Sequence, residues 1–206
     1  MPGEQTRTTG FVLAKQPSGS DSFEQLTFFS GENGVLHCLR RAAQSKTGSA
    51  PAIDLFDESE LWLESSNQGR TWFIKEHRLI QRQDGIGRSY DALRAAAALT
   101  TLIFRNAVPD ESRESIICWL RTTLAALASG GRPDIIWLKA LYCFLRDEGY
   151  PVKQQWWPSL PPADREIAAQ ILNQPLSAQT VAAPVVVRIT GQLEKWIQAE
   201  TEIRLG

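Results

Sequence analysis

Residues 71–104, TWFIKEHRLIQRQDGIGRSYDALRAAAALTTLIF, change their hydrophobic period within one stretch of chain. Trp72–Lys75 is short, and its aliphatic and aromatic side chains favour a strand. Ser89–Phe104 instead places apolar residues at helical spacing, and its alanines favour helix. Asp84–Gly87 separates the two patterns. We therefore expect a joint at Asp84–Gly87 between two unlike halves.

The half before this joint has the pattern of a small antiparallel β-structure. Segments of strand length that are rich in β-formers occupy residues 9–15, 23–29, 34–39, 52–56, 59–64 and 71–75. Turn-forming clusters separate them at Pro17–Asp21, Gly31–Gly34 and Asn67–Gly69. Strands spaced by about 8–12 residues predict a closed or sandwiched antiparallel sheet.

The half after the joint has helical periodicity and helix-ending signals. One helix begins near Asp110 and ends at Gly130, and the next begins at Pro133 or Asp134 and ends at Gly149. The remaining segments are an irregular link at Trp156–Pro162, a short helix at Ala163–Leu172 and a last helix at Val185–Ile203, in which Val185–Val187 could also form a strand. The expected fold class is α+β, with a barrel domain at residues 1–82 and an all-helical domain at residues 83–206.

The composition is that of an ordinary globular protein. The chain has 206 residues, of which 43% are hydrophobic and 22% are charged, and it contains no apolar run of membrane-spanning length. Met1–Thr9 is polar and lacks the apolar region of a signal peptide, so we expect an intracellular protein. With a net charge of −1 and a pI near 6.2, any nucleic-acid surface must be a local basic patch.

The three cysteines do not suggest a disulfide or a reactive site. Cys38, Cys118 and Cys143 lie far apart, are odd in number and form no C-x-x-C pair. Each lies in an apolar stretch, where a reduced cysteine behaves as a small hydrophobe. We therefore expect three buried thiols.

The sequence favours binding over catalysis. It contains no P-loop motif, and Gly85–Gly87 is a more natural hinge than a dinucleotide site. Two histidines, His37 and His77, are few for a metal site or a catalytic triad. One acidic cluster could perform acid–base or metal chemistry, although a solvated acidic face is the preferred interpretation: Asp54, Asp57, Glu58, Glu60 and Glu64. We expect no enzyme activity, no cofactor and no metal.

Two basic groups could grip phosphates. The first runs from His37 to Lys46, and no acid occurs between Val35 and Ala52. The second comprises Arg70, Lys75, Arg78, Arg82 and Arg88. Either group could bind a nucleic acid or could simply be a solvated surface. Three aromatic residues on neighbouring strands could stack on bases, although core packing is the preferred interpretation: Trp62, Trp72 and Phe73.

Several short motifs, taken in order, resemble the RecO family of bacterial recombination mediators and strand-annealing proteins. These motifs are Gly10–Leu13, Phe28–Ser30, Gly31–Gly34, the basic loop Leu39–Lys46, and Leu138–Leu145 followed by Gly149–Pro151. The resemblance spans about residues 9–153. It departs from the family at Lys153–Pro162, where many members have a four-cysteine zinc module and this chain has no cysteine. A zinc site is therefore not expected.

The resemblance implies an N-terminal OB-fold and a helical domain that together bind DNA without catalysis. It implies binding to single- and double-stranded DNA, annealing of complementary strands, and assistance to RecA loading on DNA coated by single-strand-binding protein. The implied location is cytoplasmic and nucleoid-associated, and a RecR-type mediator is a further possible partner. The DNA-binding candidates are Lys15, Arg40, Arg41, Lys46, Lys75, Arg78, Arg82 and Arg88.

The resemblance also implies that the acidic, hydrophobic C-terminal tail of single-strand-binding protein docks on the helical domain. Such a tail needs an apolar groove and a cation for its carboxylate. Lys139 and Arg121 are the candidates. Two alternatives remain open at this point: a protein–protein adaptor that lost DNA binding, and a metal-dependent hydrolase that uses the acids of Asp54–Glu64.

Overall fold

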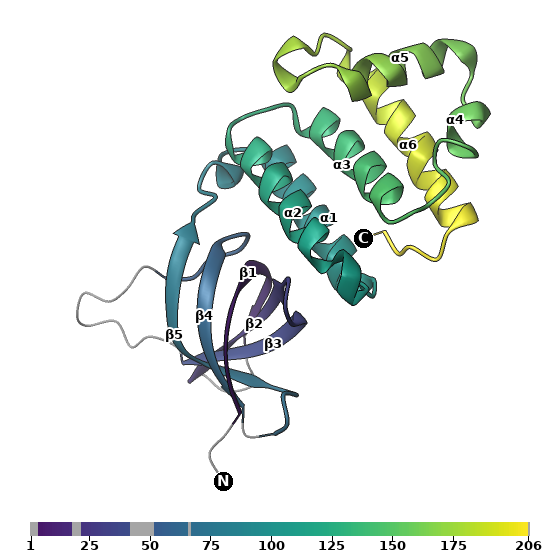
Figure 1. The fold of residues 1–206 in the computed structure, drawn as a ribbon. Coiled ribbons are helices and arrows are strands. Elements are labelled where there is room, and N and C mark those ends of the chain that lie inside the picture. Colours follow the sequence, from purple (N-terminus) through teal and green to yellow (C-terminus); the bar gives the residue numbers. More distant parts are fainter. Residues whose placement is uncertain (1–3, 18–21, 42–51, 66, 206) are drawn as a thin grey trace. The chain divides into compact units, whose positions relative to one another are not determined.

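The computed structural model describes residues 4–17, 22–41, 52–65 and 67–205, and it has an α+β fold. Five strands are followed by six α-helices, together with three short 3-10 helices, in this part of the chain (Figure 1). Contacts divide the chain into two compact units. The first unit contains residues 1–83 and 108–121, and the second contains residues 84–107 and 122–206. The first crossing between the units thus lies at Gln83–Asp84, and a second segment returns to the barrel unit.

The strands close into a barrel. They are β1 (Glu4–Pro17), β2 (Phe23–Ser30), β3 (Gly34–Arg41), β4 (Glu58–Ser65) and β5 (Trp72–Gln81). The order around the barrel is β1-β2-β3-β5-β4. The β3–β5 pairing is parallel, and the other pairings are antiparallel.

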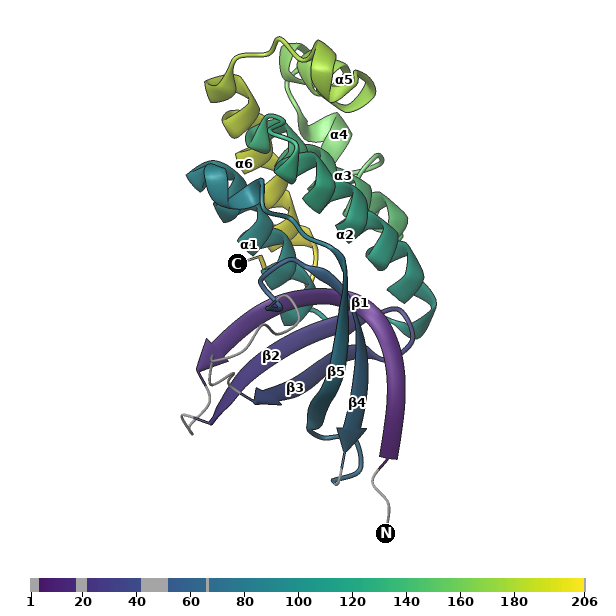
Figure 2. The ribbon, with the colours of Figure 1, turned by 90° about the vertical axis from the view of Figure 1, so that its left-hand side faces the viewer.

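Strand β1 closes the barrel because it pairs with two neighbours. Its first half pairs with β4 and its second half with β2, and a register shift lies between Val12 and Ala14. Figure 2 shows this long strand curving across the barrel. At Gly10 an added Cβ would lie 1.9 Å from the carbonyl oxygen of Phe29, so only glycine allows β2 to approach this closely.

The barrel core is continuous and apolar. It comprises Val12, Leu26, Phe28, Leu36, Cys38, Ile53, Leu61, Leu63 and Trp72. Residues 52–56, which we expected to form a strand, do not form one. Ile53 is buried in the core, and Phe56 has a φ of 66°, which breaks the extended backbone. This segment instead bonds to β1 at the register shift, where the Phe56 amide donates to the Val12 carbonyl.

Residues 108–121 belong to the barrel unit although they lie far from it in sequence. They contain the 3-10 helix η2 (Asp110–Ser112) and the beginning of α2 (Arg113–Ala128). The Arg113 guanidinium donates to the Glu32 carbonyl oxygen at 3.2 Å in the β2–β3 turn. Arg121 donates to the Glu58 carboxylate of β4. Two arginines therefore fix this segment to the barrel.

The second unit is helical. It contains η1 (Ile86–Arg88), α1 (Tyr90–Arg105), the end of α2, α3 (Pro133–Asp147), α4 (Trp156–Ser159), α5 (Pro162–Asn173), η3 (Leu176–Ala178) and α6 (Ala183–Glu200). Helix α3 packs against α1, α5 and α6. The open alternative at Val185–Val187 is resolved as helix, and the expected irregular link contains the one-turn helix α4 with Trp156 fully buried.

The joint between the strands and α1 is close-packed. Gly85 has an ordinary helical φ of −64°, so it does not need the conformational freedom of a glycine. An added Cβ at Gly85 would lie 1.8 Å from the Ala128 carbonyl oxygen at the end of α2. Gly85 therefore permits a close approach of two backbones, whereas Gly87 has no described atom within 4 Å of such a Cβ. In the described part of the chain, no helix is long and apolar enough to cross a membrane.

Candidate functional site

An aromatic pair lies on the outward face of β2, β3 and β5. Leu26, Cys38 and Trp72 point into the core, so the residues next to them along each strand point outward. Cross-strand pairing places Phe23 opposite Arg41, and Leu39 opposite Phe73. The Phe23 and Phe73 rings are half-buried and meet edge to face, with centroids 6.1 Å apart. The partly exposed rings thus form a small aromatic surface at one end of the barrel.

One arginine, Arg41, borders this aromatic surface, and Arg40 lies next to it at the end of β3. Arg41 is exposed opposite Phe23, and Arg40 is half-buried opposite Glu24. Within the described ranges, neither guanidinium has a carboxylate at ion-pair distance or a hydrogen-bond acceptor. Arg40 is two residues from the core residue Cys38, so it points to the other side of β3 from Arg41. We call the set Phe23, Leu39, Arg41 and Phe73 the aromatic–basic face. It offers rings for stacking and one cation, Arg41, whose charge no described acid neutralises. Lys46, the next basic candidate, lies outside the described residues.

The face of β1, β4 and β5 has a different electrostatic character. The Glu60 carboxylate accepts from Arg7 at 2.6 Å and forms an ion pair with Arg78 at 2.8 Å. Lys75 pairs with Glu64 at 2.6 Å. The Arg7 guanidinium also lies 4.8 Å from the centre of the Trp62 ring. Lys75 and Arg78 were DNA-binding candidates, but on this face each is already opposed by a carboxylate.

The other candidate cations of the barrel are also paired. The Lys15 ammonium lies 3.2 Å from Glu24 and 3.6 Å from Asp54. Arg82 pairs with Asp57 at 3.0 Å. Arg88 is exposed in η1 and belongs to the helical unit. Of the eight DNA-binding candidates, the structure therefore brings together only Arg40 and Arg41 without described acidic partners.

The preferred interpretation of the acidic cluster is wrong for three of its five members. Asp57, Glu58 and Glu60 are buried rather than solvated. Each meets an arginine from a distant position: Arg82 reaches Asp57, Arg121 reaches Glu58, and Arg7 and Arg78 reach Glu60. Burial raises the pKa of Asp57 above its ordinary value, although the Asp54 amide and Arg82 oppose this shift. The carboxylates thus bind strands and helix together inside the barrel unit.

The three barrel aromatics considered for stacking have different environments. Trp72 lies in the core, which confirms the preferred interpretation for this residue. Trp62 is half-buried beneath Arg7, and Phe73 points outward. Core packing is therefore the wrong interpretation for Phe73. Sequence reasoning missed Phe23, whose place beside Arg41 follows from the β2–β3 register and could have been found by pairing the strands across the Asn33-Gly34 turn.

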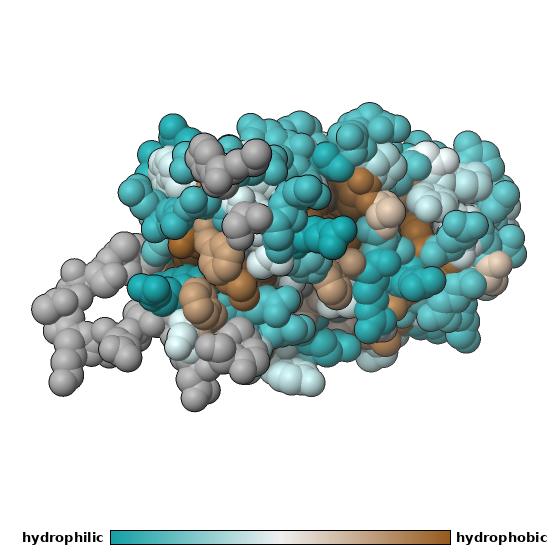
Figure 3. Space-filling view, turned by 90° about the horizontal axis from the view of Figure 1, so that it is seen from below, coloured by the Kyte–Doolittle hydropathy of each residue, from teal (hydrophilic) through white to brown (hydrophobic). Residues whose placement is uncertain are grey.

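Apolar residues gather in small groups among hydrophilic ones on the coloured surface of Figure 3. Mixed surfaces of this kind are typical of protein surfaces in general, about half of which is apolar. The hydropathy of this face is therefore no argument for a site. The aromatic–basic face is distinguished instead by its ring geometry and by the unneutralised charge of Arg41.

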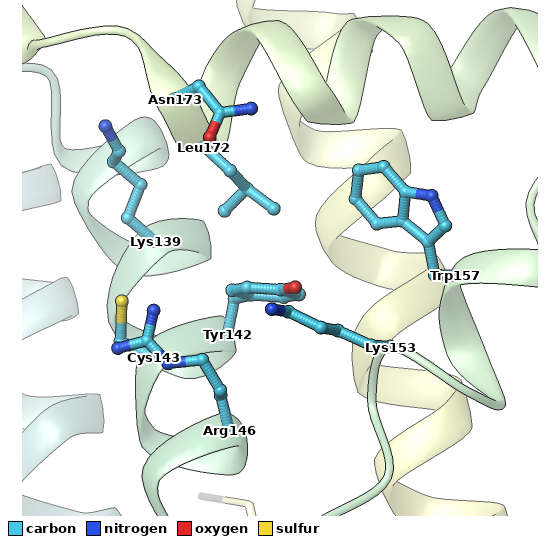
Figure 4. A pocket seen from close by; sticks show the side chains of 8 residues that line it. All are labelled: Lys139, Tyr142, Cys143, Arg146, Lys153, Trp157, Leu172 and Asn173. Carbon is cyan, nitrogen blue, oxygen red and sulfur yellow. The ribbon is translucent and has the colours of Figure 1, made fainter.

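A second candidate site is a hollow of about 370 Å³ in the helical unit. Lys139, Tyr142, Cys143, Arg146, Lys153, Trp157, Leu172 and Asn173 line it (Figure 4). Lys139 donates to the Gln174 carbonyl, and burial lowers the pKa of Lys139. Arg146 pairs with Asp147 at 2.7 Å. Lys153 is exposed and, in the part of the chain described, has no acidic partner. The hollow therefore combines an excess of cations with two aromatic rings and a leucine.

Arg121, the second candidate for partner binding, does not line this hollow. Its Nε lies 3.2 and 3.1 Å from the two Glu58 carboxylate oxygens, and its Nη2 lies 2.6 Å from one of them. These hydrogen bonds to Glu58 raise the pKa of Arg121. Arg121 is thus held inside the barrel unit by a bidentate ion pair.

The cysteines agree only partly with the expectation of three buried thiols. Cys38 is buried, which raises its pKa to about 12, and Cys143 is half-buried at the hollow. Cys118 is exposed, so the expectation is wrong for this residue, because it lies on the solvent side of α2. Among the described residues, no group of three His, Cys, Asp or Glu side chains is placed to hold a metal ion.

Comparisons with known proteins give no further assignment. No protein-family model matches the chain, and no curated protein matches it. A function is therefore inferred from the geometry of the two candidate sites.

Proposed function

We propose that this chain is a non-enzymatic DNA-binding protein of the RecO kind, whose barrel is an OB-fold that binds single-stranded DNA on the aromatic–basic face. One observation supports this proposal above all others. Arg41 borders the Phe23–Phe73 ring pair, Arg40 lies next to it at the end of β3, and no described acid neutralises either, while the other described candidate cations of the barrel are in ion pairs. Rings stack on bases and guanidinium groups hold phosphates, so the two chemistries that single strands require lie side by side.

The topology supports the same location. OB-folds are five-stranded Greek-key barrels that bind oligonucleotides on strands 2 and 3 and on the loops between strands 1 and 2 and between strands 4 and 5. This chain has a five-stranded closed barrel in which β3 and β5 are paired. The aromatic–basic face lies on β2, β3 and β5, as an OB-type binding surface would.

The proposed mechanism is annealing without a covalent step. Two DNA strands repel each other through their phosphates, and arginine neutralises this charge while counterions are released. The Phe23–Phe73 surface would hold a base by stacking, which contributes about 1–3 kcal/mol per base. Double-stranded DNA binding, RecA loading and a nucleoid-associated cytoplasmic location belong to the same proposal, as does a RecR-type partner.

The test is a salt titration of the full chain with a fluorescent oligothymidine. We expect Arg40→Glu with Arg41→Glu to weaken binding and to flatten the dependence of log K on log salt by about 1.4, the value for two phosphates on a single strand. Phe73→Ala should weaken binding about tenfold and leave the salt slope unchanged, because stacking releases no counterions.

The matched control reverses two positive charges on the helical unit instead. Lys195 and Arg204 are exposed, and their side chains have no partner among the residues the structure describes. Lys195→Glu with Arg204→Glu should bind as wild type does. Equal affinities for wild type and the Arg40/Arg41 double variant would remove the aromatic–basic face from the proposal.

The hollow of the helical unit favours a second function, docking of an acidic apolar peptide. Lys153 and Lys139 can hold a terminal carboxylate, while Tyr142, Trp157 and Leu172 can hold apolar side chains. The C-terminal tail of single-strand-binding protein has this chemistry. Because Arg121 is held by Glu58, we leave it out of this dock.

Fluorescence polarisation with such a peptide tests the dock. We expect the peptide with a free C-terminal carboxylate to bind about tenfold more tightly than its amidated form, because amidation removes the charge-assisted bond. Lys153→Glu should reduce binding, and Lys195→Glu should not. Peptide binding without DNA binding below micromolar protein would favour the adaptor alternative.

A further inference from the structure

Helix α1 has an exposed apolar stripe on the side opposite its buried face. Tyr90, Leu93 and Phe104 have 78%, 41% and 47% of their surface exposed. Ala97 is exposed and Thr101 is half-buried between them. At 3.6 residues per turn these five residues fall within about 80° of the helix circumference. The opposite side is buried in the helical unit through Ala92, Ala96, Leu99, Leu102 and Ile103.

The spacing of this stripe is symmetric about its centre. The intervals between the five residues are three, four, four and three, so Ala97 is the midpoint. A two-fold axis through Ala97 would place Tyr90 opposite Phe104 of a second copy and Leu93 opposite Thr101 of that copy. The small side chain at the midpoint lets two helices approach closely, and an aromatic pair would close each end. A self-complementary pattern of this kind fits an isologous contact.

The charges beside the stripe favour an antiparallel arrangement. Asp91 and Arg105 lie on the same flank of α1, at its two ends. An antiparallel pair brings each Asp91 beside Arg105 of the other copy, whereas a parallel pair puts the two charged flanks on opposite sides and joins no opposite charges. Both side chains have only weak contacts within the chain: Asp91 is 3.7 Å from Arg94, and Arg105 is 3.4 Å from the Leu205 carbonyl.

We propose that this stripe binds a second copy of the chain, with two α1 helices packed antiparallel about Ala97. The stripe spans about 21 Å at 1.5 Å per residue. A contact along one helix is smaller than the about 800 Å² per partner of a standard interface, so the association is weak, in the micromolar range. Two weakly associated copies could each hold one DNA strand; this consequence alone rests on the proposed function.

Sedimentation of the full chain without DNA tests the contact. Wild type should pass from monomer to dimer as protein concentration rises from about 1 μM to about 1 mM. Leu93→Glu with Phe104→Glu should remain monomeric over this range. The control is Val187→Glu on α6, which changes an equally apolar side chain that is 60% exposed and lies outside the stripe; this variant should dimerise as wild type does.

Charge exchange tests the antiparallel orientation. Asp91→Arg and Arg105→Asp should each weaken self-association about fivefold or more, because both variants place like charges together. An equal mixture of the two variants should restore it, since every Arg then meets an Asp. The proposal is overturned if wild type stays monomeric over the whole concentration range. It is also overturned if the single variants associate as strongly as wild type does. No DNA is present, so either result leaves the DNA-binding proposal to its own test.

Discussion

Asp57 is a buried carboxylate in the loop before β4. Its Oδ2 accepts from the Asp54 amide at 2.9 Å and from Arg82 at 3.0 Å. Burial nevertheless raises the pKa of Asp57, because the low-dielectric interior disfavours the charged form. The ionised side chain is therefore held in the fold against a desolvation cost, and this cost depends on pH.

Asp57→Asn should change how stability depends on pH. A carboxyl whose pKa is raised in the folded state binds its proton more tightly there than in the unfolded state. Its contribution to stability is therefore fully present below its ordinary pKa of 3.8 and declines as pH rises through the raised folded value. Asparagine can accept the Asp54 amide bond and has no such titration, so the stability of wild type relative to Asp57→Asn should fall from pH 3 upward.

Urea midpoints of wild type and Asp57→Asn across the acidic range measure this difference in stability. The contributions of all other carboxyl groups are the same in both proteins and cancel in the difference. If the urea midpoints of the two proteins change with pH in parallel, burial does not raise the pKa of Asp57. Wild type losing relative stability as pH falls would show that Arg82 and the Asp54 amide outweigh burial.

The basic residues of the candidate site could be predicted from the sequence. The ion pairs that neutralise the other basic candidates could not. The run without acids from Val35 to Ala52 singled out Arg40 and Arg41. Sequence could not separate them from Lys15, Lys75, Arg78 and Arg82, because the carboxylates that pair with these four lie across strands or loops. The same long-range pairing turned an acidic cluster that looked solvated into a buried network.

Elements with local ending signals were the most predictable. Helix α1 begins after Ser89, whose side chain accepts from the Ala92 amide, and α3 is followed by Gly149 with a φ of 82°. Residues 52–56 have β-forming composition, but their backbone bonds to β1 at a bulge, and only tertiary structure determines that bond. The joint glycines illustrate the same limit, since sequence suggested a hinge at both Gly85 and Gly87.

Gly85→Ala should destabilise the helical unit, whereas Gly87→Ala should not. A Cβ at Gly85 would lie 1.8 Å from the Ala128 carbonyl oxygen, and backbone must move to accept it. The expected loss is about 1–3 kcal/mol or more, as for overpacking. A Cβ at Gly87 meets no described atom within 4 Å, so alanine there should be neutral or stabilising by up to about 1 kcal/mol. Chemical denaturation of the two variants compares them, and equal losses would indicate that flexibility of the joint, rather than close packing, requires glycine.

In the whole molecule, neither unit is one continuous segment of the chain. Residues 84–107 leave the barrel unit, and residues 108–121 return to it before the chain enters the helical unit again. Helix α2 therefore contributes to both units, with the division after Arg121. Sequence periodicity predicts α2 as a single helix. It cannot show that the two halves of this helix belong to different units, because amphipathic spacing does not reveal what each half packs against.

The barrel should therefore depend on residues 108–121. A fragment of residues 1–83 contains all five strands but lacks Arg121, which holds Glu58, and Arg113, which holds the β2–β3 turn. Joining residues 108–121 to this fragment through a flexible linker restores both arginines. Because hydrogen bonds to charged groups contribute about 1.5–3 kcal/mol each, the joined form should be more stable than residues 1–83 by at least about 2 kcal/mol.

Urea unfolding of the two fragments measures the difference, and Arg121→Met in the joined form is the matched control. This variant keeps the helix and its apolar contacts and removes the bidentate pair, so its midpoint should lie between those of the two fragments. If residues 1–83 alone unfold at the same urea concentration as the joined form, the strands are self-sufficient and the segment only lies against them. If Arg121→Met equals the joined form while residues 1–83 are weaker, apolar packing of α2 rather than the Glu58–Arg121 pair stabilises the barrel.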